Sequence, residues 1–424
     1  MPKLIGGKLL SNFISLGTVQ ATSSLVQIIV IPHVISRVGV DGYGAISVAQ
    51  VVMFYLAVMT DYSFNQTATR AVSINRTELE QLSLIFSRVF FSRLFLCLLA
   101  MVFLALLIAV IPYFRDQMKL YSAGFVFVIG HSLMVNWFFQ GLEKMHFIAY
   151  VTLVARVLFA VLVFIYVQSV NDGYMFLFFF GIGNIVAAFV SILVVVRKYK
   201  IHFTWPGIET IFSELREGWQ IATSHLSNAI CNYSNIFILR IFTNDLVTGY
   251  YSVAERIFLA IRQVFVVYSQ AVYPALCQWL QEGRTWALAT LRKSFSVFFV
   301  LVITGSCLLF VLAPIVLQFF MGDQYMHAVF YLRMFSIIAL VVCLNIPGSL
   351  ILLAENQKKK YLRLYFTASV INLLLNSVLA YYFQADGTVT SILITECIIT
   401  ITVTRLVHRM QISEVESGRG NLVS

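Results

Sequence analysis

The sequence predicts an all-α polytopic membrane protein with about twelve transmembrane helices in two pseudo-symmetric six-helix bundles. Apolar residues make up 60% of the 424 residues and charged residues only 11%, whereas about a quarter of a soluble domain is charged. The apolar residues form runs of about 20, the length that crosses a bilayer. One signature, Gly44-Ala45-Ile46-Ser47-Val48-Ala49, recurs 205 residues later as Gly249-Tyr250-Tyr251-Ser252-Val253-Ala254. We therefore expect two equivalent halves.

Gly, Pro, Asn and Asp separate many of the apolar runs, as expected of the junctions between helices. The predicted spans are residues 9–33, 43–60, 84–111, 119–141, 146–168, 173–196, 216–242, 249–275, 294–320, 328–354, 361–384 and 387–407. The first run is too long for a signal peptide and is interpreted as a retained helix. We expect an N-terminal bundle over 1–200, a C-terminal bundle over 201–410 and a disordered tail over 411–424.

The distribution of Lys and Arg predicts the orientation of these helices. Only Arg37, Arg115 and Lys119 fall in the loops of one side, whereas the N-terminus, the alternate loops and the tail hold most of the others. Because Lys and Arg concentrate on the cytoplasmic side of membrane proteins, both termini are predicted to be cytoplasmic. The net charge of +10 therefore reflects the basic residues of the cytoplasmic side, and nucleic-acid binding is not expected.

Polar side chains form a stripe on one helix of each half. The first stripe is Gln20, Ser23 and Gln27, and the second is Ser224, Asn228, Asn232 and Asn235. Within each stripe the residues recur at helical spacing, and the 205-residue offset places Ser23 on Asn228 and Gln27 on Asn232. The stripes either line one cavity between the halves or hold helices together by interhelical hydrogen bonds. We favour the cavity.

Ionisable side chains inside a span usually face protein or water because their burial in lipid is unfavourable. The span 249–275 carries Glu255, Arg256 and Arg262, and we expect both arginines to face a cavity. Glu396 lies near the middle of the last span. It is interpreted either as a proton site or as the partner of an arginine. Three other arginines are interpreted as interfacial because their sequence positions are closer to span ends: Arg156, Arg240 and Arg333.

The polar segment 61–70 follows the second span directly and is expected to break or end that helix at the mouth of a cavity. No phosphate-binding loop, HExxH, GxSxG or Asp-x-Asp motif occurs, and the six cysteines lie in apolar runs without CxxC spacing. The sequence therefore predicts a protein that is not an enzyme and that uses no cofactor or metal.

Three segments carry a family resemblance: Asp61-Tyr62-Ser63-Phe64-Asn65-Gln66-Thr67-Ala68-Thr69-Arg70, Gly249-Tyr250-Tyr251-Ser252-Val253-Ala254-Glu255-Arg256-Ile257, and Tyr273-Pro274. They resemble the Wzx-type O-antigen flippases, which are polysaccharide transporters of the multidrug/oligosaccharidyl-lipid/polysaccharide exporter superfamily. The resemblance implies transfer of an undecaprenyl-pyrophosphate-linked oligosaccharide to the periplasmic leaflet by alternating access. It also implies a cationic lumen, in which Arg70 and Arg256 fill the motif positions; helix geometry adds Arg262.

The same resemblance implies the bacterial inner membrane as the location, and an O-antigen polymerase and a chain-length regulator as partners. Coupling to an ion gradient would need a carboxylate, for which the candidates are Asp61, Glu255 and Glu396. Two alternatives stay open. One is a multidrug or lipid II exporter of the same superfamily, and the other is a membrane O-antigen polymerase or ligase, against which the short outward loops argue.

Overall fold

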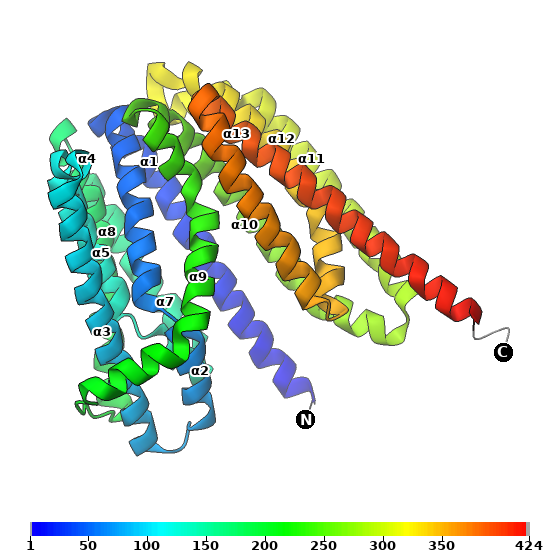
Figure 1. Cartoon of the computed structure of the whole chain (residues 1–424), viewed down its shortest axis with the longest axis horizontal. Coiled ribbons are helices and arrows are strands. Elements are labelled where there is room, and N and C mark those ends of the chain that lie inside the picture. Colours follow the sequence, from blue (N-terminus) through cyan, green and yellow to red (C-terminus); the bar gives the residue numbers. More distant parts are fainter. Residues whose placement is uncertain (1, 421–424) are drawn as a thin grey trace. The chain divides into compact units, whose positions relative to one another are not determined.

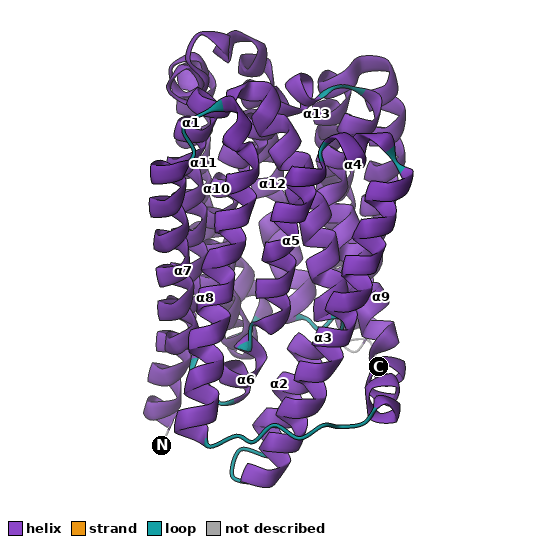
Figure 2. Cartoon of the chain, turned by 90° about the vertical axis from the view of Figure 1, so that its left-hand side faces the viewer, coloured by secondary structure: helices purple, strands orange, loops and turns teal. Residues whose placement is uncertain are grey.

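The computed structural model describes the backbone of residues 2–420 and the side chains of residues 26–230 and 233–410. This part of the chain contains helices and loops and no strand (Figure 2). Two compact units divide the chain, Met1–Ile236 and Phe237–Ser424, and each is described by itself. The predicted all-α polytopic fold is confirmed.

The first unit begins with α1 (Pro2–Asp61), which contains two helices merged across the non-helical Gly39. The further helices of this unit are α2 (Phe64–Ile74), α3 (Leu79–Val110), α4 (Pro112–Asp116), α5 (Met118–Leu133), α6 (Asn136–Gly141), α7 (Met145–Tyr166), α8 (Gly173–Tyr199) and most of α9 (Ile208–Phe242) (Figure 1). A short 3₁₀ turn, Val170–Asp172, precedes α8.

The second unit begins within α9 and continues through long apolar helices. They are α10 (Asp245–Glu282), α11 (Arg284–Met321), α12 (Met326–Ala354) and α13 (Lys358–Gly420), with a 3₁₀ turn at Gly322–Tyr325. Gln384 has non-helical dihedral angles and divides α13 into two arms. Eleven of the twelve predicted spans therefore lie along a helix to within two residues, whereas the predicted span 119–141 is divided into α5 and α6.

Several of these helices are longer than the membrane requires. Helix α3 has 32 residues, or about 48 Å at 1.5 Å per residue, whereas the hydrocarbon core is about 30 Å thick. Eight segments of the described chain are long and apolar enough to span, and one of them, Arg284–Ala354, contains both α11 and α12. Such lengths are sufficient to place the helix ends and the connecting loops outside the hydrocarbon.

The boundary between the two compact units lies within a helix. The division between the two compact units falls inside α9, and the predicted boundary at residue 200 stays a prediction. The backbone of α13 is helical as far as Gly420, whereas the sequence predicted a disordered tail from residue 411. The side chains of that tail lie outside the described residues.

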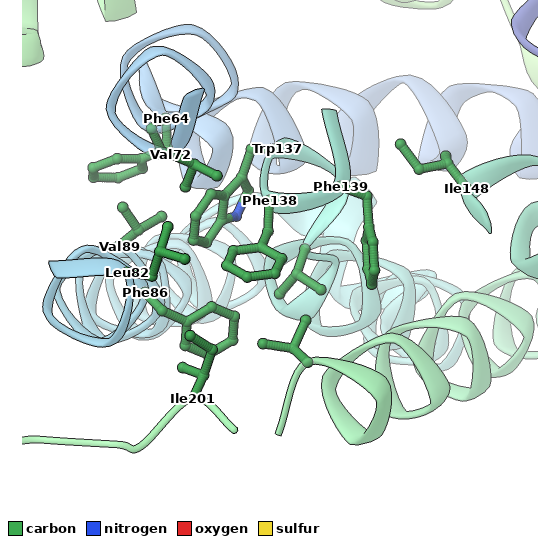
Figure 3. Packing of buried hydrophobic residues seen from close by; sticks show 13 residues of the cluster. Phe64, Val72, Leu82, Phe86, Val89, Trp137, Phe138, Phe139, Ile148 and Ile201 are labelled. Carbon is green, nitrogen blue, oxygen red and sulfur yellow. The ribbon is translucent and has the colours of Figure 1, made fainter. Parts of the chain in front are cut away.

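A buried aromatic cluster holds the short helices α2 and α6 against α3. Figure 3 shows Phe64 and Val72 of α2 beside Trp137 and Phe138 of α6, with Phe86 of α3 in the same cluster. The close approach requires a glycine, because a Cβ atom at Gly141 would lie 2.6 Å from Cγ1 of Val72. The cluster fixes α2 and α6 as a pair.

Candidate functional site

A buried arginine connects three helices of the first unit. The side chain of Arg93, on α3, is only 3% exposed. Its Nη2 atom donates to Oδ1 of Asp61 at 2.5 Å and to the backbone oxygen of His131 at 2.8 Å, and its Nη1 atom donates to the backbone oxygen of Met134 at 2.5 Å. Charged hydrogen bonds of this kind are the strong ones, so Arg93 holds these groups together.

The partners of Arg93 lie where two membrane helices are interrupted. Helix α1 ends at Asp61, Tyr62 has a φ of 50°, and α2 begins at Phe64. Helix α5 ends at Leu133 and α6 begins at Asn136. An interrupted helix leaves backbone carbonyls without intrahelical donors, and inside a membrane those carbonyls need protein partners. Arg93 supplies donors at the α5–α6 break and binds the carboxylate at the α1–α2 break.

Asp61 is bound by three side chains. Besides Arg93, it accepts hydrogen bonds from Asn65 Nδ2 at 3.0 Å, and Oδ2 lies 2.9 Å from Nε2 of His131. The predicted break after the second span is therefore present, with its first residue in a buried ion pair. We name Asp61, Arg93 and His131 the Arg93 junction.

Helix α9 contacts the same break. The Tyr62 hydroxyl donates to the backbone oxygen of Leu215 at 2.8 Å. A Cβ atom at Gly218 would lie 2.1 Å from Oγ of Ser63, so the contact requires glycine there. The α1–α2 break is thus fixed from two sides within the first unit.

Arg70 lies on α2 with an exposed side chain. The described residues include no carboxylate within salt-bridge distance of it. The exposure leaves its charge available to an anion, whereas the charge of Arg93 is already neutralised by Asp61. The role of Arg70 as a lumenal cation stays a prediction.

One group of charged side chains in the second unit lies on α10 and on the second arm of α13. The Tyr251 hydroxyl donates to Oε1 of Glu255 at 2.9 Å. Glu255 is attracted electrostatically by both Arg256 and Arg262. The guanidinium carbon of Arg262 lies 5.9 Å from the centre of the Phe258 ring, and the Arg262 side chain is otherwise exposed. Both arginines therefore act on this carboxylate from beyond salt-bridge distance in the described part of the chain.

Glu396 brings a second carboxylate close to Arg262. Its Oε2 atom accepts a hydrogen bond from Asn345 Nδ2 at 2.8 Å, and Thr400 donates to Oδ1 of the same asparagine. Electrostatic attraction by Arg262 acts on Glu396 as it does on Glu255. Arg262 thus lies within the electrostatic reach of one carboxylate on α10 and one on α13.

The two polar stripes are only partly described. The side chains of Gln20, Ser23 and Asn232 lie outside the described residues. Gln27 is half-buried on α1. On α9, Ser224 and Asn228 are exposed and Asn235 is half-buried, and Asn228 and Asn235 take part in further interactions. The shared cavity therefore stays a prediction.

Arg156 differs from its interpretation as an interfacial residue. It lies in the middle of the 22-residue helix α7, with its guanidinium carbon 4.5 Å from the centre of the Phe180 ring on α8. Its Nε atom is buried and has no hydrogen-bond partner among the described residues. Arg240, in contrast, binds Asp245 at the end of α9, as a residue near a span end should.

The sequence analysis did not select Arg93 or His131. One feature of the sequence pointed to Arg93. Its permanent charge lies well inside an apolar run, and such a charge usually requires a buried partner. The described residues contain no group of three or more His, Cys, Asp or Glu side chains placed to hold a metal ion. The charged clusters are thus built from ion pairs and hydrogen bonds.

Comparison with known proteins gives three findings. Residues 9–280 match a family described as "Polysaccharide biosynthesis protein". Two curated relatives, from Escherichia coli K12 and Shigella dysenteriae, are both named "Putative O-antigen transporter". They are 25% and 26% identical and cover 92% of this chain, which in turn covers 94% and 98% of them. An inward-facing multidrug MATE transporter of the MOP superfamily has a TM-score of 0.72, with 16% identity over 95% of this chain and 99% of its own.

Proposed function

Because this chain belongs to the polysaccharide biosynthesis protein family, we propose that it is an O-antigen flippase. It moves undecaprenyl-pyrophosphate-linked repeat units from the cytoplasmic to the periplasmic leaflet of a bacterial inner membrane by alternating access. The O-antigen transporters of similar sequence support the substrate class. The likeness to a MATE transporter supports the fold that such a movement would use.

The observation that carries the proposal is the pair of arginines on α10. Arg256 and Arg262 bring two permanent positive charges into an apolar helix. A pyrophosphate does not cross hydrocarbon unaided, whereas arginine forms two parallel hydrogen bonds to phosphate. The polyprenyl chain can stay in the lipid during the movement, so the protein needs to neutralise only the head group. Arg70 is the corresponding candidate in the first unit.

The carboxylates give the transporter a means of returning to its starting state. Glu255 and Glu396 both attract Arg262, so an anionic head group would compete with them for this arginine. Binding of a cation or proton to either carboxylate would free the arginine for the substrate. Asp61 is a weaker candidate for ion coupling, because Arg93 and His131 already occupy its oxygens. An O-antigen polymerase and a chain-length regulator would act on the delivered units.

The first experiment tests the function directly. Deletion of this protein should abolish long surface polysaccharide while lipid-linked single repeat units persist in the cytoplasmic leaflet. The measurement is the sidedness of these units, read from their accessibility to a glycosidase added outside spheroplasts. Units that reach the periplasmic leaflet and stay unpolymerised would indicate a polymerase instead. Normal polysaccharide together with increased sensitivity to cationic drugs would indicate a multidrug exporter.

A second experiment tests the proposed topology, in which both termini are cytoplasmic. Single cysteines are introduced at four exposed positions whose side chains make no described ion pair, in a background without the six native cysteines. An impermeant thiol reagent should label positions 171 and 323 on intact cells, and positions 198 and 359 only after the cells are opened. Labelling of position 198 or 359 from outside would contradict the orientation.

A further inference from the structure

A groove runs along the two arms of α13 in the second unit. Figure 1 shows the two arms, in orange and red, side by side. They pack through a small apolar cluster in which Leu364 and Ala368 meet Ile399 and Val403. Beside this contact lies a cavity of about 460 Å³, within the range of about 300–1,000 Å³ typical of small-molecule sites. The mechanism of head-group movement proposed above does not use this cavity.

The lining of the groove is charged at one end and apolar beyond it. Lys359, Lys360 and Arg363 lie in the first two turns of α13 and form the charged end. The remaining lining residues are Leu364, Thr367, Ala368, Ile371, Ile398, Ile399, Thr402 and Leu406. From Lys360 to Ile371 the helix rises about 16 Å, so the apolar part reaches well into a bilayer. A ligand of this groove therefore has an anionic head and an apolar chain.

The cations at the head of the groove have no carboxylate partner within the described residues. The nearest acidic residue along the chain, Glu355, is bound by Arg284, with Nε–Oε1 at 2.7 Å and Nη2–Oε2 at 3.2 Å. That pair leaves the three cations uncompensated among the side chains that the structure describes. An anion bound there would gain their attraction without displacing an internal salt bridge.

The arm that carries these cations presents an apolar surface to the lipid. Leu362 and Phe366, on the same arm as the cations, are 64% and 60% exposed, which is the character of a bilayer-facing surface. Basic pockets between membrane helices at the level of the head groups bind anionic lipids. We propose that this groove is a binding site for an anionic glycerophospholipid, with its phosphate on Lys359, Lys360 and Arg363 and one acyl chain between the arms of α13.

The site is tested on the purified full-length protein by native mass spectrometry, with phosphatidylglycerol or phosphatidylcholine added to the detergent. The wild-type protein should retain phosphatidylglycerol in preference to phosphatidylcholine. The triple variant K359Q/K360Q/R363Q should lose affinity for phosphatidylglycerol by on the order of tenfold or more, because each basic residue near the head group contributes. The variant R197Q/K198Q, which removes two exposed cations at the end of α8, should bind as the wild type does.

A second variant pair tests the apolar part without changing charge. Thr402 and Thr404 are both exposed, and each donates to the carbonyl four residues earlier, but only Thr402 lines the groove. Tryptophan at 402 should therefore weaken phosphatidylglycerol binding, whereas tryptophan at 404 should not. Equal binding by the 402 and 404 variants would overturn the groove and leave only attraction to surface charge.

A third arm separates the phospholipid from a polyprenyl diphosphate, which has similar chemistry. Geranylgeranyl diphosphate is added to the protein loaded with phosphatidylglycerol. We expect it to compete poorly, because its methyl-branched prenyl chain is bulkier than the unbranched acyl chain that the groove is proposed to hold. Complete displacement at equal concentration would overturn the phospholipid assignment and give the groove to the transported substrate. Because lipid retention is measured without transport, failure of this site leaves the proposed flippase function untouched, and the converse also holds.

Discussion

Substitution of Arg256 or Arg262 should produce a graded loss of O-antigen transport: partial with lysine, severe with glutamine and complete with glutamate. Lysine keeps the charge but loses the two parallel hydrogen bonds that arginine forms to phosphate. Glutamine loses the charge, and since a hydrogen bond to a charged group contributes about 1.5–3 kcal/mol, transport should fall by roughly 10- to 100-fold. Glutamate repels the head group. The measurement is long surface polysaccharide per amount of membrane-inserted protein.

The carboxylates near Arg262 allow an effect on folding to be distinguished from a loss of head-group binding. Removing Arg262 leaves Glu255 and Glu396 without this cation, which alone could lower the amount of folded protein. The double variant R262Q/E396Q removes one stranded carboxylate together with the arginine. If Arg262 binds the head group, the double variant should be well expressed and clearly more defective than the single variant E396Q.

Recovery of normal transport by the double variant would mean that Arg262 only neutralises Glu396. The matched control is R197Q, at an exposed position on α8 that makes no described ion pair. Its transport should equal that of the wild type. Loss of transport in this control would show that the assay responds to any reduction of surface charge.

The sequence predicted the helices well because each of them depends on local properties. An apolar run of about 20 residues has to form a helix in lipid, since no other structure satisfies its backbone. For the same reason the break after Asp61 was predictable, because the segment that follows it is too polar to continue a span. The break at Met134 lies inside the predicted span 119–141, where Gly130, His131 and Asn136 were too few polar or helix-breaking residues to mark the end of a helix.

The partners of the charged groups were not predictable because they are distant in sequence. Arg93 is 32 residues from Asp61 and 41 residues from Met134, on a different helix from either. Glu396 and Arg262 approach each other only when α13 packs in the second unit. Sequence position could show that each of these charges needs a partner, but only the packing of the helices determines which partner it has.

Replacement of Arg93 by methionine should have the largest effect on stability of any single change in the first unit. The variant leaves the Asp61 carboxylate, only 16% exposed, without its main cation, and leaves the carbonyls of His131 and Met134 without this donor. Loss of one partner from a buried ion pair costs about 3–5 kcal/mol. We therefore expect a clearly lower midpoint of thermal unfolding in detergent. The measurement is size-exclusion chromatography with fluorescence detection after heating.

Two further variants identify the cause of this destabilisation. R115M removes an exposed arginine that donates to the carbonyl of Ala109, and its midpoint should be close to that of the wild type because no buried carboxylate is stranded. The double variant R93M/D61N should recover part of the loss, since the neutral amide no longer carries an unpaired buried charge. The recovery should be incomplete because the carbonyls at the α5–α6 break still lack their donors. A wild-type midpoint for R93M would show that the Arg93 junction does not stabilise the two interrupted helices.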